Sequence, residues 1–179
     1  MTRSRPLAVV ALLGAIAALT SCRAHRPLDG ALPDVLAPHE GALVIVDCSS
    51  GAMRDLRPSA SAEPLPPCST FKIWNTLIAI ECGVISGDEE VFYRWDGKVR
   101  DIADWNRDLS LKEAFQVSCV PAFQDLARAI GPERMKFWLD TISYGDGDTS
   151  SGADVFWLPA PGRKTLRITP RDQAQRMCE

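Results

Sequence analysis

Two kinds of apolar pattern follow one another along the chain, and they predict a short strand pair followed by helices. Residues 42–46 form an apolar run rich in β-branched side chains, which is typical of a buried strand. Residues 49–51 are Ser-Ser-Gly, a turn sequence, so residues 53–57 are expected to form the hairpin partner. Residues 71–80 are apolar almost all round, which predicts a helix inside a core that ends near Gly83.

Three shorter amphipathic helices are expected further along, at residues 111–117, 121–130 and 132–142. A proline opens each of the last two, a position that proline favours because its missing N–H is not needed there. A strand followed by a run of helices indicates an α+β domain whose remaining strands lie elsewhere, beyond Glu179 or in another part of the chain. The apolar positions expected to face the core are Leu111, Ala114, Phe115, Phe123, Leu126, Ala127, Ile130, Met135, Trp138, Leu139 and Ile142.

Two segments are expected to lack regular structure. Residues 91–108 mix tryptophans with charged residues, which predicts a packed loop region with internal salt bridges. Residues 144–152 are rich in Gly, Asp and Ser, the composition of a loop.

The N-terminus has the pattern of an export signal. Arg3 and Arg5 supply a positive start, and residues 7–19 form an uncharged apolar run that is too short for a membrane span. The run ends in Leu-Thr-Ser-Cys, which resembles a bacterial lipobox, so Cys22 is the expected site of lipidation. The alternative is an ordinary secretory signal in which Cys22 is incidental.

This pattern divides the chain into a lipoprotein signal peptide (1–21), a tether (22–40) and a single domain (41–179). In either interpretation the product is exported, which places it in the periplasm of a two-membrane cell. Arg23 rather than Asp follows the lipidated cysteine, so sorting to the outer membrane is expected.

The C-terminus has the pattern of a helix start. Thr169 is an expected N-cap, Pro170 fits the first turn, and Asp172 stands at the third position. A helix that begins there has little length in which to bury an apolar face before Glu179. We therefore expect the sequence to be cut short.

Charge and cysteine content narrow the function classes. The net charge is −3 and no basic stripe is present, which argues against nucleic acid as a partner.

The six cysteines include Cys22; the remaining five, an odd number, predict at least one free thiol in an oxidising compartment. Their pairing is left open, and Cys82 and Cys119 can equally be small buried apolar residues. None has metal-ligand spacing, so no metal is expected.

The main candidate chemistry lies in Ser69-Thr-Phe-Lys72, at the start of the apolar stretch. On a helix this spacing puts the Ser69 hydroxyl and the Lys72 amine on one face, and a lysine can activate a serine nucleophile without histidine. His25 and His39 lie near the N-terminus, which disfavours a Ser-His-Asp site. Taken alone, the pattern more often marks an exposed helix start.

An ordered set of short segments accompanies this tetrapeptide, and together they resemble a class D β-lactamase (oxacillinase) over residues 42–175. The resemblance implies a β-lactamase/transpeptidase-like fold with a helical region and an antiparallel sheet. The segments, in order, are Ser69-Thr-Phe-Lys72, Arg94-Trp-Asp-Gly97, Asp104-Trp-Asn-Arg-Asp108, Ser118-Cys-Val120, Tyr144-Gly-Asp146 and Phe156-Trp-Leu158.

The resemblance implies a role for each residue of the site. Ser69 would attack the β-lactam carbonyl, with its backbone N–H as half of an oxyanion hole, and Ser118 would pass a proton to the leaving nitrogen. Lys72 would be the general base as a carbamate made with carbon dioxide (N6-carboxylysine), with no other cofactor. Phe71, Val120 and Trp157 would form apolar walls, and the Trp157 indole N–H would hold the carbamate.

The chain departs from the family pattern at two points. Asp146 stands where the family usually has Asn, which changes the hydrogen-bonding groups there. The family's Lys-Thr-Gly strand is missing, because Lys164-Thr165-Leu166 comes too early and has no Gly. That strand and the sheet strands after it are therefore expected to be missing from this chain.

The expected activity is hydrolysis of β-lactam antibiotics, such as penicillins and oxacillin-type compounds, through a serine acyl-enzyme; this is the chemistry of antibiotic resistance. The incomplete site predicts that the chain alone is inactive or barely active. The alternatives are a penicillin-binding sensor or receptor, a transpeptidase or carboxypeptidase of the penicillin-binding class, and an inactive gene fragment. The sequence leaves the substrate spectrum and the oligomeric state open.

Overall fold

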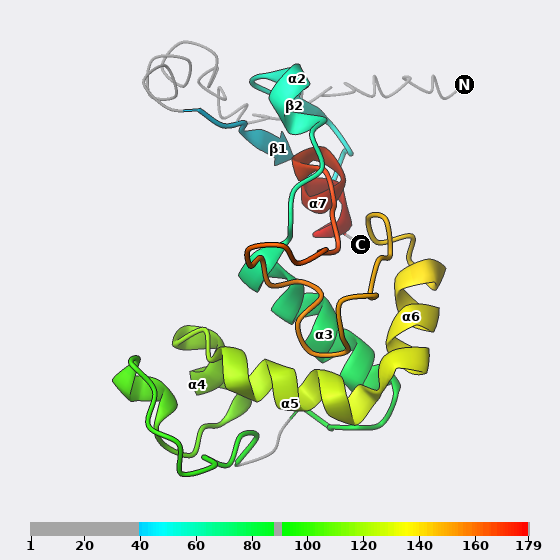
Figure 1. Cartoon of the computed structure of the whole chain (residues 1–179). Helices are drawn as coiled ribbons and strands as arrows, with labels where there is room; N and C mark the ends of the chain where they lie inside the picture. Colours follow the sequence, from blue (N-terminus) through cyan, green and yellow to red (C-terminus); the bar gives the residue numbers. More distant parts are fainter. Residues whose placement is uncertain (1–39, 88–90, 179) are drawn as a thin grey trace, which may run out of the picture.

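The computed structural model of the protein describes residues 40–87 and 91–178 (Figure 1). The expected signal peptide, Cys22 and all of the tether except Glu40 lie outside this part of the chain. The elements in chain order are β1 (Val44–Val46), β2 (Met53–Asp55), α2 (Pro58–Ser61), the 3₁₀ turn η2 (Cys68–Thr70), α3 (Phe71–Glu81), the 3₁₀ turn η3 (Ala103–Trp105), α4 (Leu111–Gln116), α5 (Val120–Ile130), α6 (Pro132–Thr141) and α7 (Pro170–Arg176).

The predicted hairpin is present as an antiparallel pair. Val44 of β1 lies opposite Asp55 of β2, and Val46 lies opposite Met53. The turn between them closes through the Asp47 N–H, which donates to the Ala52 carbonyl at 2.9 Å. The expected hairpin is therefore confirmed, with strands shorter than the apolar run.

Helix α3 occupies the centre of the fold and packs against α5 (Figure 1). Asn75 locks the two helices together, because its side-chain amide donates to the Phe123 carbonyl at 2.8 Å inside the core. Most of the apolar positions of α3 are buried, including Phe71 and Ile78. The helix over the predicted residues is confirmed, with Cys82 as its C-cap.

The prediction that α3 is surrounded by core on all sides is wrong. Ile73, Leu77 and Ile80 are 41%, 47% and 39% exposed. Their spacing puts them on one face of the helix. The two-stranded sheet lies away from α3, with α7 between them (Figure 1).

Helices α4, α5 and α6 are confirmed at the predicted positions, with ends shifted by one residue. Ser110 and Glu113 form a reciprocal capping box at the start of α4, which satisfies N–H groups that have no partner within the helix. Gly131, with φ +84°, both ends α5 and precedes α6, so the two helices meet at a sharp corner. The buried core includes Phe123, Leu126, Ala127, Ile130, Met135 and Leu139, as expected.

Helix α7 is tied to the hairpin at the other end of the chain (Figure 1). Thr169 caps it as predicted, since its hydroxyl accepts from the Asp172 N–H at 3.0 Å. Arg171 forms an ion pair with Asp55 of β2, with a contact of 2.6 Å. Cys178 is disulfide-bonded to Cys48, a pairing the sequence left open. A short helix with no fully buried residue is thus held by a covalent bond and an ion pair.

The remaining described cysteines, Cys68, Cys82 and Cys119, are free thiols, so the expected free thiol is present. Among residues 40–87 and 91–178, no helix has the length and apolar character needed to cross a membrane.

Candidate active site

The fold brings the three predicted catalytic residues into mutual contact. The Lys72 amine donates to the Ser69 hydroxyl and to the Ser118 hydroxyl, each at 2.8 Å. The Ser118 hydroxyl in turn donates to the Ser69 hydroxyl at 3.1 Å. Ser118 lies 49 residues from Ser69 along the chain, so tertiary folding brings it to the other two residues.

Ser69 is exposed, and the backbone around it explains why. It lies in η2, the 3₁₀ turn that leads into α3, and is preceded by Cys68 with φ +50°. That conformation is rare for a residue other than glycine and turns the chain sharply before the helix begins. The Ser69 hydroxyl thus faces outward while Lys72, one helical turn later, points into the core.

Lys72 is 2% exposed, which is unusual for a lysine. Burial is the main cause that lowers the pKa of its amine below the ordinary value near 10.5, because the charged form is poorly solvated there. The ring of Phe123 lies 5.6 Å from the Lys72 amine. At neutral pH a larger share of the amine is therefore neutral than in an exposed lysine, and a neutral amine can accept a proton.

Ser118 sits just after α4 in a strained backbone conformation. Its φ is +49°, in the left-handed region. Hydrogen bonds on both sides hold this conformation: the Ser118 N–H donates to the Phe115 carbonyl at 3.1 Å and the Cys119 N–H to the Ala114 carbonyl at 2.8 Å. Strained residues held in this way are frequent at active sites.

The three predicted wall residues divide between the core and a surface pocket. Phe71 and Trp157 are completely buried and lie in contact, with ring centroids 5.3 Å apart. Val120 instead lines a pocket of about 510 Å³, together with Ile102 and Trp105. The structure thus places two of the predicted walls in the core that carries Lys72 and one at a nearby pocket.

The indole N–H of Trp157 is buried and has no hydrogen-bond partner within residues 40–87 and 91–178. A buried donor without an acceptor is costly, and such groups in native structures usually have a functional reason. The ring packs against Phe71, the residue next to Lys72. This unpaired donor therefore belongs to the same core region as the buried lysine.

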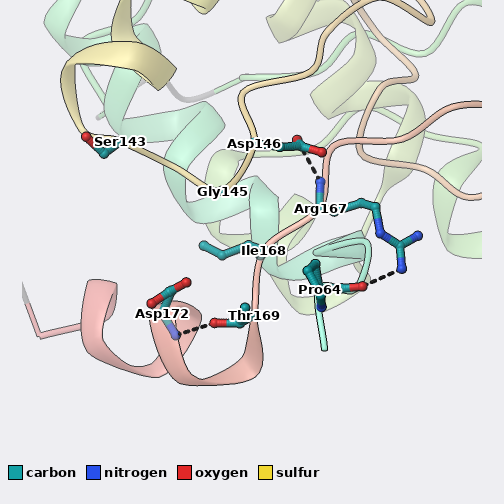
Figure 2. A pocket seen from close by; sticks show the side chains of 8 residues that line it. All are labelled: Pro64, Ser143, Gly145, Asp146, Arg167, Ile168, Thr169 and Asp172. Atoms are coloured by element: carbon teal, nitrogen blue, oxygen red, sulfur yellow. Dashed lines mark hydrogen bonds between the residues drawn. The ribbon is translucent and has the colours of Figure 1, made fainter. Parts of the chain in front are cut away.

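Asp146 lies in a loop away from the three predicted catalytic residues, where it holds neighbouring backbone groups (Figure 2). Its carboxylate accepts from the Arg167 N–H at 3.0 Å and from the Asp148 N–H at 3.1 Å. The side-chain oxygen of the family's usual Asn could accept both bonds equally well. The neighbouring pocket, of about 350 Å³, is lined by Pro64, Ser143, Gly145, Asp146, Arg167, Ile168, Thr169 and Asp172, and so by none of the three predicted catalytic residues.

Sequence reasoning missed two supporting side chains. Phe123 was expected only as a core position, but its ring also lies beside the Lys72 amine. Trp105 was seen only as part of a family segment, but its indole N–H donates to the Val117 carbonyl at 2.9 Å, next to Ser118. Neither contact leaves a signal in residue spacing, because each joins segments that are distant in sequence. No group of three or more metal-binding side chains is found within the described residues.

Comparison with known proteins agrees with this geometry. Residues 35–177 match the family described as the penicillin binding protein transpeptidase domain. The chain is 46% identical over 136 residues to Beta-lactamase OXA-10 of Pseudomonas aeruginosa, covering 74% of the chain and 48% of that protein. It is 50% identical over 107 residues to Beta-lactamase OXA-48 of Klebsiella pneumoniae, covering 60% of the chain and 38% of that protein.

Solved structures give the same result. The fold superimposes on a class D β-lactamase from Bacillus subtilis with a TM-score of 0.71 and 36% identity, covering 77% of this chain and 56% of that one. The chain spans about half the length of the curated relatives it matches. With a matching family domain over most of its length and class D relatives in both comparisons, the chain belongs to the penicillin-binding protein transpeptidase family, in its class D β-lactamase branch.

Proposed function

We propose that the site attacks β-lactam antibiotics through an acyl-enzyme on Ser69, the chemistry of β-lactam hydrolysis, with little or no turnover by this chain alone, as the sequence predicts. The observation that carries this proposal is the placement of the buried Lys72 amine 2.8 Å from both serine hydroxyls. An exposed nucleophile beside a base of lowered pKa is the arrangement that serine acylation needs. The relatives named as β-lactamases support β-lactams as the substrate class, and penicillins and oxacillin-type compounds are the members we propose.

The acylation step uses contacts that are already formed. The Ser69 oxygen attacks the β-lactam carbonyl carbon while its proton passes to the neutral Lys72 amine. When the ring carbon–nitrogen bond breaks, the proton moves from Lys72 to the leaving nitrogen through Ser118, which touches both other residues. A water molecule then cleaves the ester, giving the ring-opened acid and the free Ser69 hydroxyl.

The surroundings of Lys72 also fit its modification as a carbamate. A buried amine of lowered pKa reacts with carbon dioxide in its neutral form, and the unpaired Trp157 N–H is a donor for the resulting carboxylate. Lys72 and Trp157 are therefore the residues that would bear and hold the group. Carbon dioxide bound in this way would supply a carboxylate base at neutral pH.

Acylation is tested by the intact mass of the protein after brief incubation with benzylpenicillin in bicarbonate buffer. We expect a gain equal to one penicillin molecule, because ring opening adds the whole compound to Ser69. The adduct should be absent from Ser69→Ala and present in Ser50→Ala, a control on the exposed turn between β1 and β2. An unchanged mass in the folded wild-type chain, shown to be folded by circular dichroism, would contradict the proposal.

The lifetime of the adduct separates hydrolysis from stable penicillin binding. If the chain hydrolyses its substrate, the adduct disappears and ring-opened penicillin accumulates in excess of protein. An adduct that persists for hours with no excess product is the result we expect for this chain alone, and a penicillin-binding sensor would give the same result.

A second prediction concerns Trp157. With ¹³C-labelled bicarbonate we expect a carbamate carbon signal in the wild-type chain. Trp157→Phe should lower the affinity for the carbamate at least about tenfold, because the variant keeps an aromatic ring but loses the charge-assisted hydrogen bond. The measurement is the ¹³C NMR signal against bicarbonate concentration. Trp138→Phe, on the half-exposed side of α6, is the matched control and should bind as the wild type does. Equal signals in all three proteins would show that Trp157 does not hold the group.

A further inference from the structure

The backbone conformation of Ser118 is strained, so contacts from neighbouring groups must hold it in place. Its φ of +49° is disfavoured for a serine. Its hydroxyl contacts both the Lys72 amine and the Ser69 hydroxyl. A rotation of the peptide before Ser118 would swing its hydroxyl away from both partners. The Val117 carbonyl, which belongs to that peptide, is therefore the atom whose position matters most.

Trp105 holds that carbonyl. The indole N–H of Trp105 donates to the Val117 oxygen at 2.9 Å. Val117 is the C-cap of the short helix α4, where carbonyl groups lack partners within the helix. The peptide that leads into Ser118 is thus held at both of its polar atoms, the Ser118 N–H by the Phe115 carbonyl at 3.1 Å and the Val117 oxygen by a donor from outside the helix.

Hydrogen bonds within the loop that carries Trp105 restrict its conformation. Arg100 pairs with Asp96 through two hydrogen bonds of 2.8 and 2.9 Å. The Asn106 side chain then closes the loop from both directions, accepting from the Arg100 N–H at 2.8 Å and donating to the Arg100 carbonyl at 2.9 Å. These bonds hold η3, whose last residue is Trp105, in a single conformation.

We propose that Trp105 is a positioning residue that orients Ser118 toward Lys72 and Ser69 through the Val117 carbonyl. This inference rests on the proposed function, since it assigns Trp105 to the proton path of acylation. Trp105 itself does not touch the reacting hydroxyls. It acts by restricting the peptide before Ser118 to the conformation in which the Ser118 hydroxyl meets the lysine amine.

The chain offers a matched control in Trp95. Its indole N–H also donates to a backbone carbonyl at 2.9 Å, that of Lys98, within the same loop region. The Lys98 carbonyl also accepts from the Arg100 side chain at 3.0 Å, so it keeps a partner when the Trp95 indole is removed. Replacing each tryptophan with phenylalanine removes one indole donor and keeps an aromatic ring, and only the Trp105 indole contacts the peptide before Ser118.

The first test is the rate of acylation by benzylpenicillin, measured on the full chain by intact mass over a range of concentrations. We expect Trp105→Phe to lower the maximal acylation rate about tenfold, the effect of one lost hydrogen bond, with the half-saturating concentration changed less than twofold. Trp95→Phe should stay within twofold of the wild type in both. A loss confined to the half-saturating concentration would assign Trp105 to contact with the ligand and overturn the proposal.

A double-mutant cycle shows whether the effect passes through Ser118. On a Ser118→Ala background, Trp105→Phe should cause no further loss, because there is no hydroxyl left to orient. A further tenfold loss in the double variant would show that Trp105 acts by another route.

The second test needs no β-lactam chemistry, so it separates failure of this inference from failure of the proposed function. Hydrogen exchange at the Ser118 and Cys119 amides reports the order of this turn, since both amides are hydrogen-bonded in the structure. We expect exchange at least tenfold faster in Trp105→Phe and unchanged in Trp95→Phe. Unchanged exchange in Trp105→Phe overturns the inference even if the wild-type chain acylates normally. Faster exchange with no acylation in the wild type supports the positioning contact and rejects the proposed function.

Discussion

Lys72→Met is expected to lower the rate of penicilloyl-adduct formation by at least about a hundredfold, while the folded chain becomes more stable at neutral pH. The first effect follows from losing the group that takes the Ser69 proton, since general bases contribute about 10² to 10⁴ in rate. Methionine keeps the length and shape of the side chain, so the core around Phe71 and Phe123 should stay packed. The rate is measured by intact mass in the same bicarbonate buffer as for the wild type.

The gain in stability follows from the burial of the amine. Burial lowers the pKa of Lys72 in the folded chain, whereas the unfolded chain keeps the ordinary value near 10.5. Below the folded-state pKa the amine is charged in both the folded and the unfolded chain, and its desolvation opposes folding. Between the two pKa values the unfolded chain binds more protons than the folded chain, so the free energy of unfolding rises with pH. Removing the amine removes that cost, and we expect a gain of about 1 kcal/mol at pH 7, as is common for active-site residues.

The same argument predicts how the two proteins compare as pH changes. The stability difference between Lys72→Met and wild type should be largest below the folded-state pKa and shrink as the pH approaches 10. Urea denaturation at pH 6, 7, 8, 9 and 10 measures it. Lys112→Met, an exposed position on α4, should leave both the acylation rate and this pH dependence unchanged. A Lys72→Met chain that is less stable than wild type at every pH would show that the amine stabilises the fold.

Local signals in the sequence predicted most of the elements and two of the three reacting side chains. The hairpin, α3 to α6 and the cap at Thr169 each have a signature within a few residues, and the structure contains all of them. Ser69 and Lys72 are three residues apart, so helical geometry alone brought them together. Ser118 entered only through the resemblance to class D β-lactamases, because no local pattern connects residues 46 positions apart.

The features that could not be predicted all depend on long-range packing. The disulfide between Cys48 and Cys178 spans 130 residues, and five candidate cysteines allow many pairings. The exposed stripe of α3 reads as core in the sequence, since Ile73, Leu77 and Ile80 are as apolar as their buried neighbours. Whether such a face is covered depends on which other elements reach it, and periodicity carries no information about that.

Gly145→Ala is expected to destabilise the fold by about 3 kcal/mol or more, the largest stability effect of any glycine substitution in the described chain. Gly145 has φ +58°, where any side chain costs about 1 kcal/mol. A methyl group there would collide with the Arg167 carbonyl, whose carbon would lie 3.0 Å away. Figure 2 shows the two segments side by side.

The collision cannot be relieved cheaply because the Arg167 backbone is held from both sides. Its carbonyl accepts from the Asp146 N–H at 2.9 Å, and its own N–H donates to the Asp146 carboxylate at 3.0 Å. The flanking residues Leu166 and Ile168 are both buried in the core. A shift of Arg167 would therefore break two hydrogen bonds, each worth about 1 kcal/mol, and disturb two packed side chains.

A second glycine isolates the steric contribution. Gly83 has φ +65°, nearly the same conformation, but a methyl group placed on it would meet no atom within 4 Å. Gly83→Ala should cost only the conformational penalty of about 1 kcal/mol, so the difference between the two variants in urea denaturation measures the clash with Arg167. Equal losses would mean that the segment around Arg167 yields freely, and that its close approach to Gly145 does not limit which residue can stand at position 145.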